Sequence, residues 1–318
     1  MITGTYKFIL DEKVVAEQKN ALTMPGRSIA IKSLLGVIPN FAGVISYGIG
    51  NEKNTISAST NFIVNNNLQF EIGRTPVIGS SLELLNSTDI LVYKGVIDST
   101  SQYQIYEVGL FPGGITNTNA DVAGSTIFDF DQVDLFTKIG TASASYLVDA
   151  SESRIGSQLF YLSQTDGINS YIGYNSTNNS LSLIDNYTSL DTFRLAGLDT
   201  NLYSSSISFR FYSDENNYFS YIFTTPTSSG YFITSVEKGS AVSIGSPNWS
   251  NITTVRIWQN SASYIYLDGL KIDFGSYLID TVIGMISRAV LDTPVRKPAG
   301  IPLTIEYSLS IGFNQIGL

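Results

Sequence analysis

The chain of 318 residues contains no cysteine and no histidine. Without cysteine there are no disulfides, no thiolate nucleophiles and no cysteine-based zinc sites. Without histidine, Ser-His-Asp hydrolysis, histidine proton shuttles and nearly all catalytic zinc or iron sites are also excluded. Few enzyme mechanisms remain after these two absences, so we expect a protein that is not an enzyme and that uses no cofactor and no catalytic metal.

Charge is also scarce. Only 14% of the residues are charged, the net charge is −9, and the lysines and arginines are scattered along the chain. A surface that follows phosphates needs clustered positive charge, so nucleic acid is a poor partner. No window approaches the run of about 18 apolar residues that a membrane helix needs, and the N-terminus lacks the pattern of a signal peptide. We therefore expect no membrane span.

The composition that remains is typical of β-rich proteins. Hydrophobic residues make up 43% of the chain, and serine, threonine, asparagine, glycine and tyrosine take the places that charged residues usually fill. The length exceeds that of one typical domain, which indicates two or more hydrophobic cores.

The first third of the chain predicts a small antiparallel β-sandwich with one helix. Residues 1–22 alternate as a hairpin that turns at Asp11-Glu12-Lys13. A short helix is expected over about residues 25–35, because Pro25 suits a first helical turn and Gly36 suits a left-handed stop. Strand and turn patterns then follow at regular spacing up to Pro112-Gly113-Gly114.

The next region, residues 115–275, predicts a second and larger sandwich. It contains alternating segments such as S-I-S-F-R-F-Y-S, Y-F-S-Y-I-F-T-T and T-T-V-R-I-W-Q-N, separated by turns such as residues 214–217. In the last segment, residues 276–318, alternate apolar residues from Ile301 to Ile311 form one buried side of a long strand. We expect this strand to return to the first domain, although spacing alone leaves a plain tandem of two domains equally open.

Several blocks also resemble a known class of protein. G-T-Y-K-F-I-L-D-E-K, L-Q-F-E-I-G-R-T-P-V and Y-Q-I-Y-E-V-G-L-F resemble, in this order, the opening domain of tailed-bacteriophage virion proteins, often tail-fibre, baseplate or other appendage components. Residues 286–311 are similar to the segment that ends such proteins. The resemblance implies that residues 1–114 with 276–318 form a discontinuous particle-docking domain, and that residues 115–275 are an insertion that projects outward.

The inserted region has a resemblance of its own. N-W-S-N-I-T-T-V-R-I-W-Q-N and Y-I-Y-L-D-G-L-K-I are similar to the closing strands of concanavalin-A-like jelly rolls, as in lectin and laminin-G-type modules. The expected fold class is thus all-β: a small antiparallel sandwich with one short helix, plus an inserted jelly roll.

Aromatic residues of the second domain are the candidate binding residues, because sugars stack on tyrosine and tryptophan rings. The alternative is that they are core residues or cross-strand pairs, since aromatics favour strands. The possible glycan contacts are Tyr203, Tyr212, Tyr218, Tyr221, Trp249, Trp258 and Tyr264.

Acidic residues give weaker candidates. Asp129, Asp131 and Asp134 form the densest carboxylate group, which suits a solvated linker better than a calcium site because the rest of an EF-hand spacing is missing. A glycosidase needs two carboxylates that face a sugar, and the strands S-I-S-F-R-F-Y-S and Y-F-S-Y-I-F-T-T contain none.

The expected function is that of a non-enzymatic structural component of a tailed-phage virion, located in the tail or another exterior appendage. Its expected partners are other virion structural proteins and further copies of itself in a ring or trimer, with a host-surface glycan as a possible ligand. Two alternatives stay open. One is a capsid decoration or head-fibre protein, and the other is a glycan-binding adhesin that recognises the host.

Overall fold

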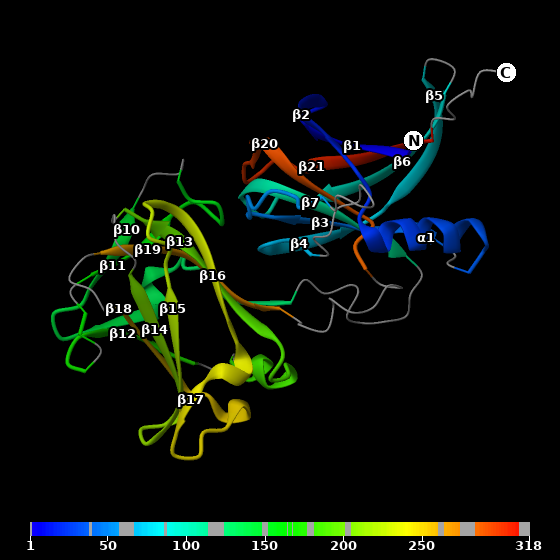
Figure 1. Ribbon diagram of the computed structural model, residues 1–318. Helices are drawn as coiled ribbons and strands as arrows, with labels where there is room; N and C mark the ends of the chain where they lie inside the picture. The colour runs from blue at the N-terminus through cyan, green and yellow to red at the C-terminus, as the bar shows by residue number, and fades with distance from the viewer. Residues whose placement is uncertain are drawn as a thin grey trace. The chain divides into compact units, whose positions relative to one another are not determined.

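The computed structural model divides the chain into two compact units, which are described separately (Figure 1). Unit 1 comprises residues 1–123 and 277–318, and unit 2 comprises residues 124–276. The residues that the structure describes are 2–37, 40–56, 67–85, 88–113, 124–147, 152–163, 165–166, 168–176, 181–200, 205–259, 264–273 and 284–311.

Unit 1 contains two antiparallel sheets and the single α-helix of the described residues. The five-stranded sheet has the order β2-β1-β21-β6-β5, and the four-stranded sheet has the order β20-β7-β3-β4. The bounds of the elements are β1 Ile2–Leu10, β2 Lys13–Asn20, α1 Met24–Leu34, β3 Asn40–Gly48, β4 Glu71–Pro76, β5 Gly79–Leu85, β6 Thr88–Ile97, β7 Tyr103–Gly113, β20 Ser287–Lys297 and β21 Leu303–Ile311.

The residues at the start of the chain form the predicted hairpin and helix. Asp11 and Glu12 have positive φ angles of 49° and 62°, as the tight turn between two antiparallel strands requires. The side chain of Thr23 caps α1 by accepting a hydrogen bond from the Gly26 N–H, at 2.9 Å. Gly36 follows the helix with φ 71°. The predictions of an N-terminal hairpin and a short helix are therefore confirmed.

The last described strand, β21, lies inside the five-stranded sheet. It pairs with β1 on one side and with β6 on the other. Its alternate residues Leu303, Ile305, Tyr307 and Leu309 are buried in the core of unit 1, as the alternation predicts. Ile301 was expected on the same buried face, but it precedes the strand and is 37% exposed.

Unit 2 consists of two six-stranded antiparallel sheets. One has the order β10-β11-β19-β13-β16 with β8 beside β19, and the other has the order β17-β15-β14-β18-β12-β9. The strands are β8 Ser125–Phe128, β9 Phe136–Ile139, β10 Ser143–Leu147, β11 Leu159–Ser163, β12 Tyr171–Asn175, β13 Thr192–Asp199, β14 Ser206–Asp214, β15 Asn217–Thr224, β16 Gly230–Glu237, β17 Val242–Ile244, β18 Thr254–Gln259 and β19 Ile265–Asp273.

Short 3-10 helices join these strands: η2 Val133–Leu135, η3 Ser182–Asn186, η4 Lys238–Ser240 and η5 Trp249–Asn251. The two sheets of unit 2 enclose one apolar core rich in phenylalanine, including Phe160 and Phe193 from one sheet and Phe209 and Phe223 from the other. This arrangement confirms the expected fold class, all-β with a small sandwich and an inserted jelly roll. Among the described residues, no helix is long and apolar enough to cross a membrane.

Candidate functional site

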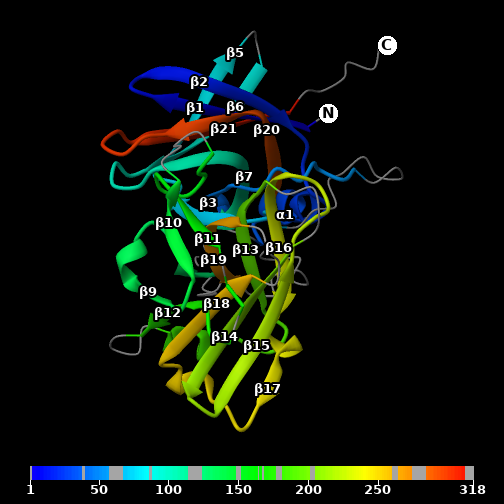
Figure 2. The same cartoon turned by 90° about the vertical axis from the view of Figure 1, so that its left-hand side faces the viewer.

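The outer face of the β17-β15-β14-β18-β12-β9 sheet combines arginines and aromatic residues. In β14, Ile207, Phe209 and Phe211 belong to the core. Because side chains alternate along a strand, the residues between them, Arg210 among them, lie on the opposite, outer face. Figure 2 shows β14 and β15 side by side in this sheet.

Strand register brings the outer residues of neighbouring strands together. Val255 and Ile257 of β18 point into the core, so Arg256 and Trp258 lie on the outer face. The register places Arg256 opposite Arg210 and Trp258 opposite Ser208. On the other side of β14, Tyr218 of β15 lies opposite Tyr212.

Each arginine lies between two aromatic rings. The Arg210 guanidinium carbon is 4.8 Å from the ring centroid of Tyr218 and 4.6 Å from that of Trp258. The Arg256 guanidinium carbon is 4.3 Å from the ring of Tyr212 and 4.9 Å from that of Tyr171. Cation–π contacts at these distances hold both guanidinium groups in place. We call this set the arginine–aromatic face: Tyr171, Arg210, Tyr212, Tyr218, Arg256 and Trp258.

The two ends of this face differ in how their charges are paired. Arg256 donates a hydrogen bond of 2.8 Å to Glu215, whose side chain is 81% exposed in the turn after β14. The Nε atom of Arg210 is buried and has no hydrogen-bond partner among the described residues. Tyr212 and Trp258 are only 4% and 6% exposed. The guanidinium groups and ring edges, rather than open ring faces, are therefore what a ligand meets here.

The structure brings together three of the seven aromatic residues that the sequence singled out: Tyr212, Tyr218 and Trp258. Tyr221 and Trp249 point into unit 2 instead, which corrects the expectation that they meet a glycan. Tyr221 is 2% exposed, and the Trp249 ring stacks on Phe219 with centroids 4.1 Å apart. Tyr221 fills the core because it occupies an inward position of β15, and the half-buried Trp249 of η5 packs against the same core.

Tyr264 immediately precedes β19 of the other sheet. It is 41% exposed and lies with Tyr161 and Tyr266 in a group whose ring centroids are 5.5 to 5.7 Å apart. This group is a smaller aromatic patch without a charged member. The remaining candidate, Tyr203, lies outside the described residues.

Sequence reasoning missed Tyr171, Arg210 and Arg256. A signal for the arginines was present, because R-F-Y and R-I-W place an arginine two residues before an aromatic residue and so on the same face of a strand.

Buried charges elsewhere in unit 2 hold loops rather than ligands. Asp268 is fully buried and accepts hydrogen bonds from the backbone N–H groups of Arg154 and Ile155 and from the hydroxyls of Ser153 and Tyr231. Burial raises the pKa of Asp268 to about 7, and these hydrogen bonds offset part of the rise. A carboxyl so enclosed cannot touch a substrate.

Two of the three carboxylates singled out in residues 129–134, those of Asp129 and Asp131, bind nearby backbone, and Asp134 is exposed. Asp131 accepts a hydrogen bond from the Ser157 N–H, and Asp129 accepts one from the Asp131 N–H. Burial raises the pKa of Asp131. Within the described ranges, no group of three or more acidic residues is arranged to hold a metal ion.

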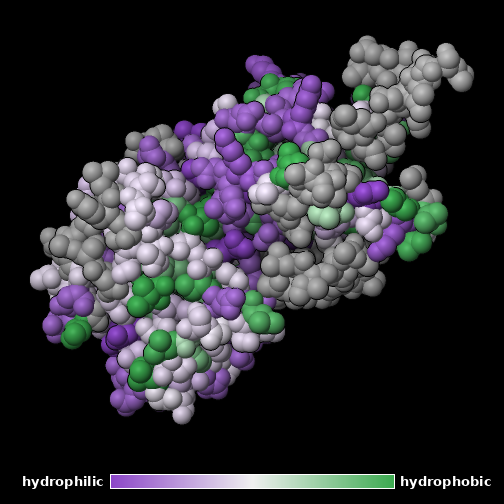
Figure 3. Space-filling model, viewed as in Figure 1, coloured by the Kyte–Doolittle hydropathy of each residue, from purple (hydrophilic) through white to green (hydrophobic). Residues whose placement is uncertain are grey.

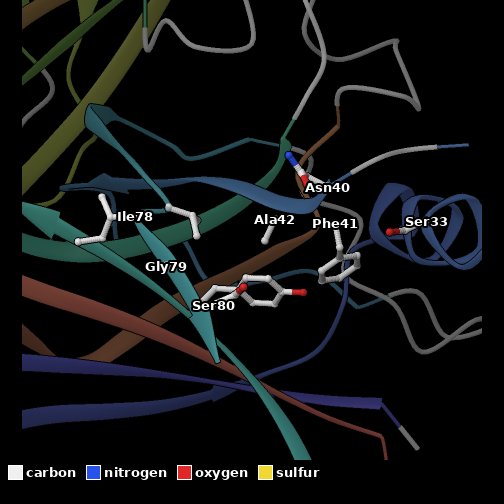
Figure 4. A pocket seen from close by; sticks show the side chains of 9 residues that line it. Ser33, Asn40, Phe41, Ala42, Ile78, Gly79 and Ser80 are labelled. Carbon is white, nitrogen blue, oxygen red and sulfur yellow. The ribbon is translucent and has the colours of Figure 1, made fainter. Parts of the chain in front are cut away.

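Unit 1 has a recess of its own, with a volume of about 450 Å³ (Figure 4). It lies between the end of α1, the start of β3 and the strands β5 and β6, and Phe41 and Tyr93 place their rings 6.0 Å apart beside it. None of the described residues that line it is charged. Its chemistry is therefore that of a packing groove.

No protein-family model and no curated protein matches the chain. Among solved structures, it is similar to a family 11 carbohydrate-binding module from Clostridium thermocellum, in complex with a β-1,3-1,4-mixed-linked tetrasaccharide (12% identity, 56% of this chain and 98% of that chain, TM-score 0.33). It is also similar to the CBM22-2 xylan-binding domain from Paenibacillus barcinonensis Xyn10C (10% identity, 47% and 97%, TM-score 0.31).

A third similar structure holds the CBM22-1 and GH10 modules of the Clostridium thermocellum xylanase 10B, with 11% identity, 48% of this chain covered and a TM-score of 0.33. The matched part spans only 29% of that xylanase chain, and 24% of the chain of an exo-β-agarase. Identities and TM-scores this low carry no inference about function.

Proposed function

We propose that this chain is a non-catalytic component of a tailed-phage particle, in which unit 1 docks to the particle and unit 2 binds a glycan. The observation that carries the glycan proposal is the arginine–aromatic face. The arginine N–H groups donate hydrogen bonds to sugar oxygens, and the edges of the tyrosine and tryptophan rings beside them present apolar surface to the sugar. This face combines both on one rigid sheet.

Docking through unit 1 is supported by its exposed apolar residues. Val14 and Val15 lie on the edge strand β2, and Leu82 lies on the opposite edge strand β5 of the same sheet. Exposed strand edges readily add another strand or pack against a partner. Apolar side chains are also exposed near the end of α1, at Ile31 and Leu35 (Figure 3). The placement in a phage particle rests on the sequence resemblance.

The non-catalytic assignment rests on the chemistry of the face. Its titratable groups are arginines and tyrosines, and both acids beside it have partners: Glu215 pairs with Arg256, and Asp214 accepts hydrogen bonds from Asn217. Glycoside hydrolysis needs two carboxyl groups that flank the scissile bond. The strands β12, β14, β15 and β18 offer a binding surface rather than that pair.

The proposal is tested with purified particles and with the purified full-length chain. Antibodies against residues 124–276 are expected to label an exterior appendage in electron micrographs, and a glycan array is expected to give specific binding that Arg210→Ala and Tyr218→Ala reduce. The matched control is Tyr264→Ala, which removes an exposed tyrosine from the opposite sheet. Label over the capsid shell would identify a decoration protein, and absence of label would contradict the virion assignment. An array without binding would contradict the glycan assignment.

A further inference from the structure

The charge on the arginine–aromatic face is unbalanced. Apart from Asp214 at the end of β14, the charged residues on the outer face of β12, β14, β15 and β18 are Arg210 and Arg256. These two arginines lie directly opposite each other. Like charges opposite each other on neighbouring strands destabilise a sheet. Of the two acids in the adjacent turn, Asp214 accepts hydrogen bonds from Asn217 and Glu215 pairs with Arg256.

Arg210 is thus the arginine whose charge is not matched by either acid of that turn. Its guanidinium lies between Tyr218 and Trp258, and its buried Nε has no hydrogen-bond partner among the described residues. A buried donor without a partner costs free energy. An anion bound to the terminal N–H groups of Arg210 would reduce the repulsion from Arg256.

The shape of the site limits the kind of anion. Aromatic rings lie against the Arg210 guanidinium and its Nε is buried, so the terminal pair of N–H groups is the part left for a ligand. That pair matches a carboxylate with two parallel hydrogen bonds. The net charge of −9 disfavours a ligand that is charged on every unit, because long-range repulsion opposes its approach.

We propose that the arginine–aromatic face binds an acidic glycan in which carboxylate-bearing sugars alternate with neutral ones, with the terminal N–H groups of Arg210 holding the carboxylate and the half-buried Tyr218 contacting a neighbouring sugar. This inference rests on the proposed glycan-binding function and specifies its ligand class. Arg256, already paired with Glu215, supplies additional positive potential from the opposite strand.

Isothermal titration of the full-length chain tests this inference with hyaluronan oligosaccharides, in which glucuronic acid alternates with a neutral sugar, and with the same oligosaccharides after reduction of their carboxyl groups. We expect the acidic form to bind about tenfold or more tightly than the reduced form, since charge-assisted bidentate pairs are among the strongest hydrogen bonds. Raising the salt concentration is expected to narrow this difference.

Substitutions of Arg210 test whether the preference for the acidic form depends on the paired N–H donors of its guanidinium. Arg210→Gln is expected to abolish the preference for the acidic form, and Arg210→Lys, which keeps the charge and loses the paired donors, is expected to lose most of it. Lys138→Gln is the matched control, because it removes one positive charge from an exposed position of β9 in the same sheet. Thermal unfolding of each variant shows whether its fold is intact.

The results of these experiments distinguish the acidic-glycan inference from the broader proposal that unit 2 binds a glycan. Equal affinity for the acidic and reduced oligosaccharides, or array binding to neutral glycans alone, would overturn the acidic-glycan inference while glycan binding stands. Loss of preference in Lys138→Gln to the same extent as in Arg210→Gln would overturn the role of Arg210. Tighter binding to single-stranded oligothymidylate than to the oligosaccharide would overturn both proposals. Aromatic residues beside arginines also bind single-stranded nucleic acid, because bases stack on the rings. Absence of binding to any glycan would do the same.

Discussion

Glu107 lies in the middle of β7 with its side chain fully buried. It accepts hydrogen bonds from the backbone N–H groups of Gln69 and Phe70, at 2.9 and 2.8 Å, and from that of Gly50, at 3.2 Å. It also pairs with the buried Arg288 of β20 at 2.7 Å. One carboxylate therefore joins β7, the residues that precede β4 and the strand that returns after unit 2.

Replacement of Glu107 is expected to destabilise unit 1 strongly. Glu107→Gln leaves Arg288 buried without a counter-charge, which typically costs about 3–5 kcal/mol of unfolding free energy. Glu306→Gln is the control, because Glu306 lies 4.0 Å from the half-exposed Lys94, and such surface pairs contribute about 0–1 kcal/mol. Urea unfolding of both variants measures the difference. Similar losses in the two variants would contradict the structural role of the Glu107–Arg288 pair.

Asp268 is expected to give unit 2 an unusual dependence on pH. Its pKa is about 7 in the folded chain against an ordinary value of 3.8. Between these values the folded state holds a proton that the unfolded state has released, so this group makes unfolding easier as the pH rises from about 4 to 7. Asp268→Asn is expected to remove this contribution, so that its stability falls more steeply toward acid than that of the wild type.

Asp166 is expected to change the stability of unit 2 with pH in the opposite direction to Asp268. Asp166 accepts hydrogen bonds from the backbone N–H groups of Ile168, Asn169 and Ser170, which lower its pKa. Its contribution to stability is therefore present at neutral pH and is lost as the pH falls through the lowered value. Calorimetric melting temperatures of the wild type, Asp268→Asn and Asp166→Asn compare the two groups from about pH 7 to below pH 3.8, where the Asp166 contribution is lost. A steeper acid-side loss in the wild type than in Asp268→Asn would contradict the raised pKa of Asp268.

At the scale of single elements, the parts of the fold that sequence predicts are those specified by nearby residues. The N-terminal hairpin and α1 follow from the Asp11-Glu12 turn, Pro25 and Gly36, each of which acts within a few residues. Strand β21 follows from its own alternation. Pairing partners are not specified locally, and spacing alone did not decide whether β21 pairs with the first domain or forms part of a tandem.

The candidate face was predictable only in part, and the reason lies in how strands use aromatic residues. In unit 2, aromatic residues occupy both faces: Phe209 and Phe211 fill the core, and Tyr212 lies outside. The presence of an aromatic residue therefore does not predict whether its strand position faces the core or the outside. An arginine predicts an outward position, because a buried unpaired guanidinium is costly. Arg210 and Arg256 thus indicate the outer face more reliably than the rings that flank them.

At the scale of the whole chain, unit 2 is inserted between two strands of unit 1 that pair with each other in antiparallel fashion. Strand β7 leads toward unit 2, β20 returns from it, and the two strands pair with each other with Leu110 opposite Ser287. A connection of this kind resembles a long loop, and the entropic cost of closing a loop grows only slowly with its length. Unit 1 therefore has all its sheet partners whether or not unit 2 is present.

Two deletions test this independence of the units. Removal of residues 115–283 joins β7 to β20 by a short glycine-containing turn, and unit 1 is expected to fold with its own cooperative transition because both of its sheets are complete. Removal of residues 287–318 takes away β20 and the strand β21 that lies between β1 and β6. That deletion is expected to unfold unit 1 while the transition of unit 2 survives. Calorimetry and circular dichroism of both proteins distinguish the cases, and loss of both transitions on the second deletion, or of neither, would contradict an independently folding insertion.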